Sequence, residues 1–189
     1  MANKVKFGLS EVHIAPITSI TDGVYTYGDI FALPGAVNLT LDIAGEEENF
    51  YADNIIYFNQ SANQGYTGSL EVALLNDNFR EKILNELKDS NGAYIEDATR
   101  ATKGFALGFQ IDGDTANKRY WYYNVTANRP SNNGSTIEAS KTPQTETVNI
   151  TASPRIGDKR VRCSLEKTTE NASVYNNFFS TVYESNISG

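Results

Sequence analysis

The sequence predicts a mainly β protein, an antiparallel β-sandwich or barrel with a flanking short α-helix and a long projecting β-hairpin loop. Three observations predict this class. Apolar and polar residues alternate in several short segments, as in half-buried strands. Only two short segments have helical spacing. The 189 residues include 11 Tyr and 9 Phe, residue types that favour strands. We expect a single domain spanning residues 1–189.

The first half of the chain contains the most regular alternation. Residues 37–43 alternate strictly, which predicts that Val37, Leu39, Leu41 and Ile43 lie on one face. Further strands are expected at 5–16, 24–33 and 66–74. A short helix is expected over 78–88, with Asn78 as its N-cap and Glu81 completing a capping box.

The second half adds four strands around a polar loop at 128–143. The strands are expected at 105–111, 119–127, 145–152 and 159–167. The last segment, 170–189, is expected to be a C-terminal helix or arm, because its aromatic residues are spaced for a short amphipathic helix: Tyr175, Phe178, Phe179 and Tyr183. Two alternatives stay open for it, namely closing the sandwich of its own chain or docking on a neighbouring molecule.

The segment 46–64 lies between two expected strands and keeps no regular period. Connections of this length are uncommon inside compact domains and are usually functional or disordered. Disorder would leave much apolar surface in water, because the segment contains Phe50, Tyr51, Ile55, Ile56, Tyr57 and Phe58. We therefore interpret it as a projecting hairpin that becomes ordered against a partner.

The net charge of −7 is unevenly distributed along the chain. Residues 1–79 contain two basic and ten acidic residues, whereas residues 80–189 carry a net charge of +1. One interpretation is a solvated acidic face that favours solubility. The other is a surface that repels a polyanion or meets a basic partner. Ordinary DNA binding is disfavoured, since phosphate affinity comes from clustered Lys and Arg.

Residues for catalysis or metal binding are scarce, so we expect no enzyme, no cofactor and no metal. The chain has one histidine, His13, and one cysteine, Cys163; zinc sites need several such ligands. No nucleophile elbow or P-loop motif is present. Asp112-Gly113-Asp114 is more typical of a turn than of a calcium loop. We expect synthesis in the cytoplasm and no membrane association, because no signal peptide or apolar span is evident.

An ordered set of short segments resembles a known family of structural proteins. The segments are 1–9 (MANKVKFGL), 33–39 (LPGAVNL), 50–54 (FYADN), 63–71 (NQGYTGSLE), 124–131 (NVTANRPS) and 144–147 (QTET). Together they are similar to the major tail proteins (tail tube proteins) of long-tailed, non-contractile phages of Gram-positive bacteria. The resemblance extends from residue 1 to about residue 155.

The resemblance implies a virion protein that assembles as homo-hexameric rings stacked into a hollow tail tube. Its partners would be other copies of itself, other phage tail proteins at the tail tip and terminator, and double-stranded DNA that passes through without binding. It also implies that a long hairpin of each subunit, 46–64 by position, reaches an adjacent ring. The inter-ring contact candidates are Phe50, Tyr51, Ile55, Ile56, Tyr57 and Phe58.

A tube that transports DNA is expected to have a lumen that repels it. Duplex DNA carries one negative charge per about 1.7 Å, so carboxylates on the wall favour passage over binding. The lumen-lining acidic candidates are Asp42, Glu46, Glu47, Glu48 and Asp53.

Other functions compete with this interpretation. The main alternative is a carbohydrate-binding or adhesive β-sandwich, because the chain is rich in the aromatic and Asn residues that suit sugars. A carboxylate-dependent hydrolase has no positive support. A related tube-like component, such as a tail-end or secretion-tube protein, is a further alternative that composition does not distinguish from a tail tube protein.

Overall fold

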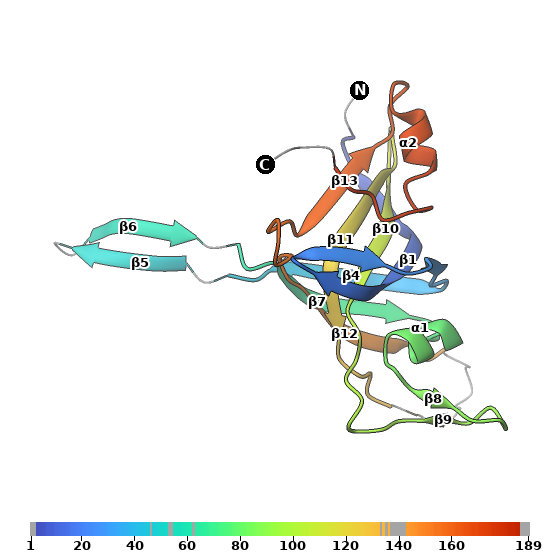
Figure 1. The fold of residues 1–189 in the computed structure, drawn as a ribbon. Coiled ribbons are helices and arrows are strands. Elements are labelled where there is room, and N and C mark those ends of the chain that lie inside the picture. The colour runs from blue at the N-terminus through green and yellow to red at the C-terminus, as the bar shows by residue number, and fades with distance from the viewer. Residues whose placement is uncertain are drawn as a thin grey trace.

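A computed structural model describes residues 3–45, 47–52, 55–61, 63–132, 134, 136 and 143–185; within 47–61 only the backbone is described. The fold is mainly β, with 46% strand and 7% helix, which confirms the predicted class (Figure 1).

Most strands belong to one antiparallel sheet with the order β2-β1-β10-β11-β12-β7-β4, in which β3 also pairs with β1 and β13 with β11. These strands are β1 (Lys6–Thr21), β2 (Val24–Tyr27), β3 (Phe31–Ala32), β4 (Ala36–Ile43), β7 (Tyr66–Val72), β10 (Phe105–Gly113), β11 (Lys118–Ala127), β12 (Glu146–Ala152) and β13 (Arg162–Glu166). Closure of this sheet into a sandwich or barrel stays a prediction.

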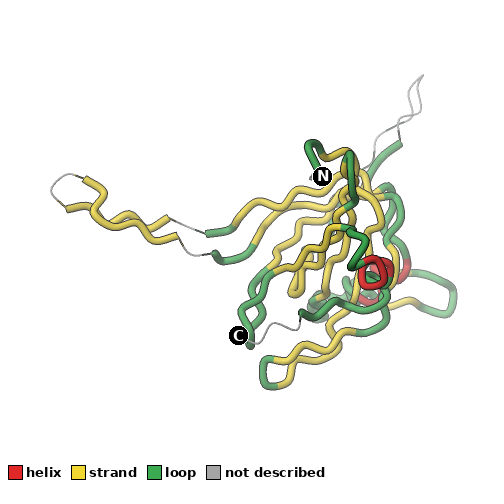
Figure 2. Tube along the Cα trace, turned by 90° about the horizontal axis from the view of Figure 1, so that it is seen from above, coloured by secondary structure: helices red, strands yellow, loops and turns green. Residues whose placement is uncertain are grey.

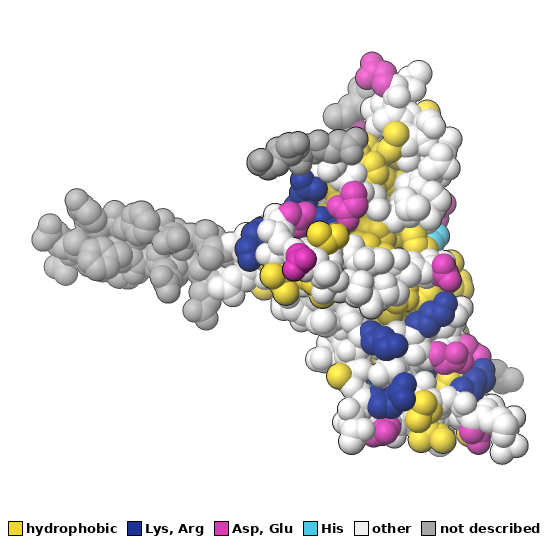
Figure 3. Space-filling model, in the orientation of Figure 1, with side chains coloured by type: hydrophobic (Ala, Val, Ile, Leu, Met, Phe, Trp, Pro, Cys, Tyr) yellow, Lys and Arg dark blue, Asp and Glu magenta, His cyan; other side chains and the backbone are white. Residues whose placement is uncertain are grey.

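Two short helices and two small hairpins complete the fold. They are α1 (Asp77–Lys82) and α2 (Ala172–Asn176), the pair β5 (Glu47–Ala52) and β6 (Ile55–Ser61), and the pair β8 (Leu87–Lys88) and β9 (Tyr94–Ile95). Lys, Arg, Asp and Glu side chains are interspersed around α1, β8 and β9 (Figure 3), where Lys88 forms ion pairs with Asp77 and Glu81.

Strand β11 is the branch point of the sheet. One of its edges pairs with β10, whereas the other pairs with β13 over residues 118–122 and with β12 over 125–127. Between these two partners, the Tyr123 N–H donates to Val161 O at 3.0 Å and Asn124 O accepts from the Ser153 N–H at 2.9 Å. The backbone at the branch is therefore satisfied without a continuous partner strand.

Alternate residues of β10 and β11 contribute to two hydrophobic clusters on opposite faces of the sheet. Tyr120 and Tyr122 belong to the first cluster, which also contains the buried residues of α1. Trp121 and Tyr123 belong to the second cluster, which the C-terminal segment covers. Both faces are buried because successive strand residues point to opposite sides.

The predicted boundaries of the first helix were wrong at both ends. The N-cap is Asn76, whose Oδ1 accepts the Phe79 N–H at 3.0 Å, rather than Asn78. The sequence offers Asn at both positions, and the earlier start packs Phe79 against the core with 0% exposure. Glu81 accepts from the Tyr94 hydroxyl instead of completing a capping box. The helix ends by residue 83, and residues 87–88 form β8.

The strictly alternating segment 37–43 forms β4, but the prediction of one shared face fails at one of its four residues. Leu39, Leu41 and Ile43 keep one register against β7, and Leu39 and Leu41 pack against the first cluster. Ile43 is on this face but 73% exposed, whereas Val37, 55% exposed, leaves the face. A register irregularity between Ala36 and Asn38 explains the position of Val37, because Ala36 packs against the cluster and Val37 does not.

Candidate assembly surfaces

The hairpin β5–β6 extends the strand pair β4–β7 away from the rest of the molecule (Figures 1 and 2). Its strands pair with each other, with Phe50 opposite Phe58 and Tyr51 opposite Ile56, and with no other described strand. The predicted projecting hairpin within 46–64 is therefore confirmed at the level of the backbone.

The root of the hairpin depends on glycine. The β4–β7 ladder continues through Ala44, whose N–H donates to Gly65 O at 2.8 Å and whose carbonyl accepts from Gln64 N–H at 2.9 Å. Gly65 has a φ of +105°, and a Cβ there would lie 2.0 Å from Ala152 O. A Cβ at Gly68 would lie 1.9 Å from Thr40 O. Close approach of neighbouring strands therefore requires both glycines.

Few of the predicted lumen and inter-ring residues have described side chains. Glu46 and Asp53 lie outside the described residues. Only the backbone is described for Glu47 and Glu48 of β5 and for the inter-ring candidates Phe50, Tyr51, Ile55, Ile56, Tyr57 and Phe58. Asp42 has a described side chain, which is exposed at the hairpin end of β4 opposite Thr67.

Asp42 belongs to a polar face that the sequence analysis did not identify. The face comprises the outward residues of β4, β7 and β12, and no described residue of this set is Lys or Arg: Asn38, Thr40, Asp42, Thr67, Ser69, Glu71, Thr147, Asn149 and Thr151. Two carboxylates, Asp42 and Glu71, are its charged groups, and Glu71 accepts from the Thr145 hydroxyl at 2.6 Å. The signal in the sequence is the polar half of each alternating segment, which lies opposite the apolar half that forms the core.

The C-terminal segment, residues 171–185, packs on the sheet of its own chain. Three side chains of β11 donate to its backbone: Arg119 to Tyr175 O at 2.6 Å, Trp121 to Phe178 O at 2.9 Å, and Tyr123 to Tyr183 O at 2.9 Å. Because residues 119, 121 and 123 alternate along the strand, these donors point to the same face.

Aromatic burial fixes the same segment. Tyr175 and Phe178 are buried, while Phe179 and Tyr183 are partly buried against the second cluster. Of the two alternatives for these four residues, packing within the chain is the arrangement found.

Arg155 joins the end of this segment to the loop that follows β12. Its guanidinium forms ion pairs with Asp158 and Glu184 and lies 4.3 Å from the centroid of the Tyr123 ring. Burial alone would lower the pKa of Arg155, but the bonds to Glu184 and Asp158 raise it above its usual value. This side chain therefore stays charged at all accessible pH values and holds Glu184 in place.

The two residues considered for catalysis have structural contacts. The His13 ring stacks on Phe179 with centroids 4.4 Å apart, and its Nδ1 lies 2.8 Å from Glu11 O. Burial raises the pKa of the Cys163 thiol, which keeps the sulfur protonated at neutral pH. Within the described ranges there is no group of three His, Cys, Asp or Glu side chains that would hold a metal. In the same part of the chain, no helix has the length and apolar character needed to cross a membrane.

No protein-family model matches the chain, and no curated protein matches it in sequence. The resemblance to phage major tail proteins stays a prediction.

Proposed function

We propose that this chain is a structural virion protein that polymerises as stacked hexameric rings into the hollow tail tube of a long-tailed phage. The observation that carries the proposal is the hairpin β5–β6, whose two strands pair only with each other among the described strands. An isolated two-stranded hairpin is marginally stable in water, and its unpaired edges are templates for pairing with another chain. A hairpin that projects from the body is therefore suited to contact a second molecule.

The sequence of the hairpin supports a permanent contact. Six of its residues are aromatic or β-branched apolar, namely Phe50, Tyr51, Ile55, Ile56, Tyr57 and Phe58. Aromatic residues are enriched among the anchors of protein interfaces. A hairpin that contacts a different surface of the next copy forms a heterologous interface, and repetition of such an interface gives rings or filaments.

The polar face on β4, β7 and β12 suits the wall of a channel for DNA. It offers hydroxyl, amide and carboxylate groups, with Asp42 and Glu71 as its charges. Screening acts over about 8 Å at physiological salt, so these carboxylates repel a duplex that passes close to them. Glu46, Glu47, Glu48 and Asp53 stay lumen candidates on the sequence alone.

Negative-stain electron microscopy of the purified protein tests the proposal. Dilute protein without a seed is expected to stay monomeric, whereas concentrated protein with a tail-tip seed is expected to form rings or hollow tubes of uniform bore. A matched variant replaces residues 45–63 by an Asn-Gly turn, which preserves the ladder that ends at Ala44 and Gln64. This variant is expected to fold, as judged by circular dichroism and the fluorescence of Trp121, and to remain unassembled.

Two results would contradict the proposal. One is a wild-type protein that stays monomeric under every seeded condition. The other is assembly of the 45–63 variant into the same tubes as the wild type. In the first case, a glycan-binding screen of the monomer tests the alternative of a carbohydrate-binding module.

A further inference from the structure

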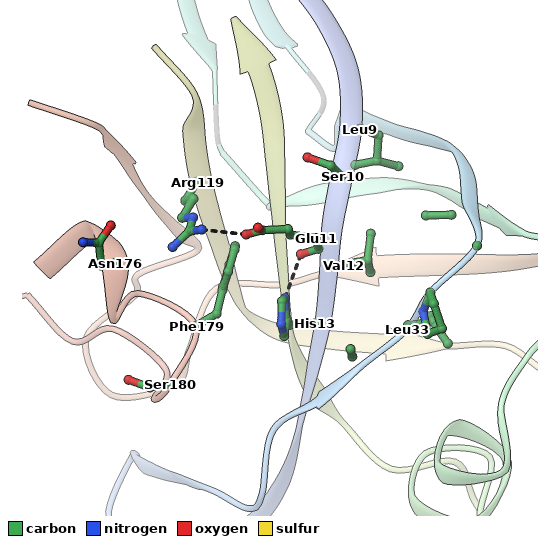
Figure 4. Close-up of a pocket in the computed structure, with 14 residues that line it drawn as sticks. Leu9, Ser10, Glu11, Val12, His13, Leu33, Arg119, Asn176, Phe179 and Ser180 are labelled. Carbon is green, nitrogen blue, oxygen red and sulfur yellow. Dashed lines mark hydrogen bonds and ion pairs between the residues drawn. The ribbon is translucent and has the colours of Figure 1, made fainter. Parts of the chain in front are cut away.

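A groove with a volume of about 710 Å³ lies beside the start of β4. Three parts of the chain line it: residues 9–13 of β1, residues 32–36 that lead into β4, and the C-terminal segment at Asn176, Phe179 and Ser180 (Figure 4). Arg119 of β11 completes the lining. Its volume is within the range of about 300–1,000 Å³ found for ligand pockets, so it is large enough for several side chains.

The groove follows the edge of a strand. Residues 9–13 are consecutive, and consecutive strand residues point to opposite faces, so a surface lined by all five runs along the edge of β1. On its other edge this part of β1 pairs with β10. Along the groove, β3 pairs with β1 only at His13 and Ile14. The outer edge at Leu9 and Ser10 is therefore open to a further strand within the described structure.

The walls of the groove combine apolar and polar side chains, and contacts on both sides hold them in place. Val12 and Leu33 are 3% and 1% exposed and anchor one side in the first cluster. On the other side, the Phe179 ring lies between the His13 ring, at 4.4 Å, and the Arg119 guanidinium, at 4.7 Å. Arg119 is itself held by Glu11, with its Nη2 2.7 Å from Oε2. A groove fixed in this way binds without first ordering its own side chains, which favours affinity.

We propose that this groove receives the β5–β6 hairpin of a second copy of the chain. The proposal rests on the proposed function and adds the site at which the hairpin binds. The groove and the hairpin lie at opposite ends of β4, because Ala36 lines the groove and Ile43, the last residue of β4, lies at the end from which the chain enters the hairpin. Seven residue steps along a strand span about 23 Å. A shift of one copy along this direction brings its hairpin to the groove of the next.

The chemistry of the two surfaces is complementary. The hairpin provides strands with unpaired edges among the described strands. The groove provides an open strand edge between partly apolar walls. Addition of an extended segment to such an edge is a common mode of recognition. The irregular register between Ser10 and His13, with Glu11 at a φ of 50°, limits regular pairing at this edge. Such irregularities protect an edge from uncontrolled pairing, so side chains of the hairpin provide the specificity.

Disulfide cross-linking between two variants tests the contact directly. In a Cys163→Ser background, one protein carries Ser180→Cys in the groove. Its partner carries Asn59→Cys or Gln60→Cys, two consecutive residues of β6. After mixing, assembly and oxidation, a non-reducing gel is expected to show a cross-linked dimer for one of the two hairpin positions. Ser90→Cys, an exposed serine in the β8–β9 turn, is the matched control and is expected to give no such dimer.

A charge placed at the groove gives a second test. Residues 46–64 contain four acidic residues and no Lys or Arg, so Ala32→Glu places a carboxylate on the exposed rim against an acidic segment. We expect the concentration needed for assembly to rise about tenfold or more. Ala98→Glu, at an exposed alanine in another loop, is expected to assemble like the wild type.

The outcomes separate this proposal from the proposed function. Tubes with a cross-link at residue 180 and none at residue 90 support both. Tubes without a cross-link at residue 180, combined with normal assembly of Ala32→Glu, overturn the groove and leave the tube. A cross-link at residue 180 in dimers that never form tubes supports the groove and contradicts the tube. Absence of both tubes and cross-links overturns both.

Discussion

Truncation of Phe178 tests how strongly the C-terminal segment holds the sheet. The side chain is 2% exposed and contacts the rings of Phe179 and Tyr183, with centroids 5.7 and 5.4 Å away. Phe→Ala in a core costs about 3–5 kcal/mol. We expect about 3 kcal/mol for Phe178→Ala, because a segment near the chain end relaxes more easily than a central strand. The bond from Trp121 to Phe178 O involves the backbone and is retained.

The assay is urea unfolding of the monomer, followed by fluorescence. The chain contains one tryptophan, Trp121, which is fully buried beneath this segment and therefore reports its release. For a chain of this length, 3 kcal/mol corresponds to a fall in melting temperature of about 6–12 °C. Phe7→Ala is the matched control, because Phe7 is 74% exposed. A Phe178→Ala variant as stable as Phe7→Ala would refute the reasoning.

Three further predictions concern the pH dependence of stability, the close approach of two strand backbones at Gly68, and the ion pairs of Arg155. Burial raises the pKa of the Tyr27 hydroxyl to about 12. The unfolded chain therefore loses this proton at a lower pH than the folded protein, and the free energy of unfolding falls as pH rises from about 10 towards 12. The urea midpoint of Tyr27→Phe should fall less steeply than that of the wild type over this range. Gly68→Ala should lower the free energy of unfolding by more than about 2 kcal/mol, because the added Cβ would meet the backbone of β4. Gly8→Ala is the control: the nearest atom to its added Cβ would be 3.8 Å away, so its free energy of unfolding should change by less than about 1 kcal/mol. Arg155→Met should cost about 1–3 kcal/mol, since it removes the hydrogen bonds of a buried guanidinium to the partly exposed carboxylates of Asp158 and Glu184. A double-mutant cycle with Glu184→Gln should give a coupling energy above about 0.5 kcal/mol, and additive effects would contradict the ion pair.

Local patterns predicted the central strands and the hairpin. The strands at 105–111, 119–127 and 145–152 correspond to β10, β11 and β12, because their alternation or aromatic content is strong over their full length. The hairpin within 46–64 was predicted from the break in period between two alternating segments. Such signals need only neighbouring residues, so they are readable without the fold.

Features that depend on distant contacts were missed. The helix start at Asn76 is set by where Phe79 meets the core, not by the capping motif alone. The exposure of Val37 follows from a register irregularity against β7. The groove combines residues 9–13 and 32–36 with residue 179, which are far apart in the sequence. No window of the sequence contains that combination.

The four aromatic residues 120–123 at the centre of β11 have an evolutionary consequence. Tyr120 to Tyr123 are all buried, and they contribute alternately to the two hydrophobic clusters. A surface strand tolerates substitution at every second position, but this stretch has no such position. In related sequences, these four residues should therefore change only together with their neighbours in both clusters.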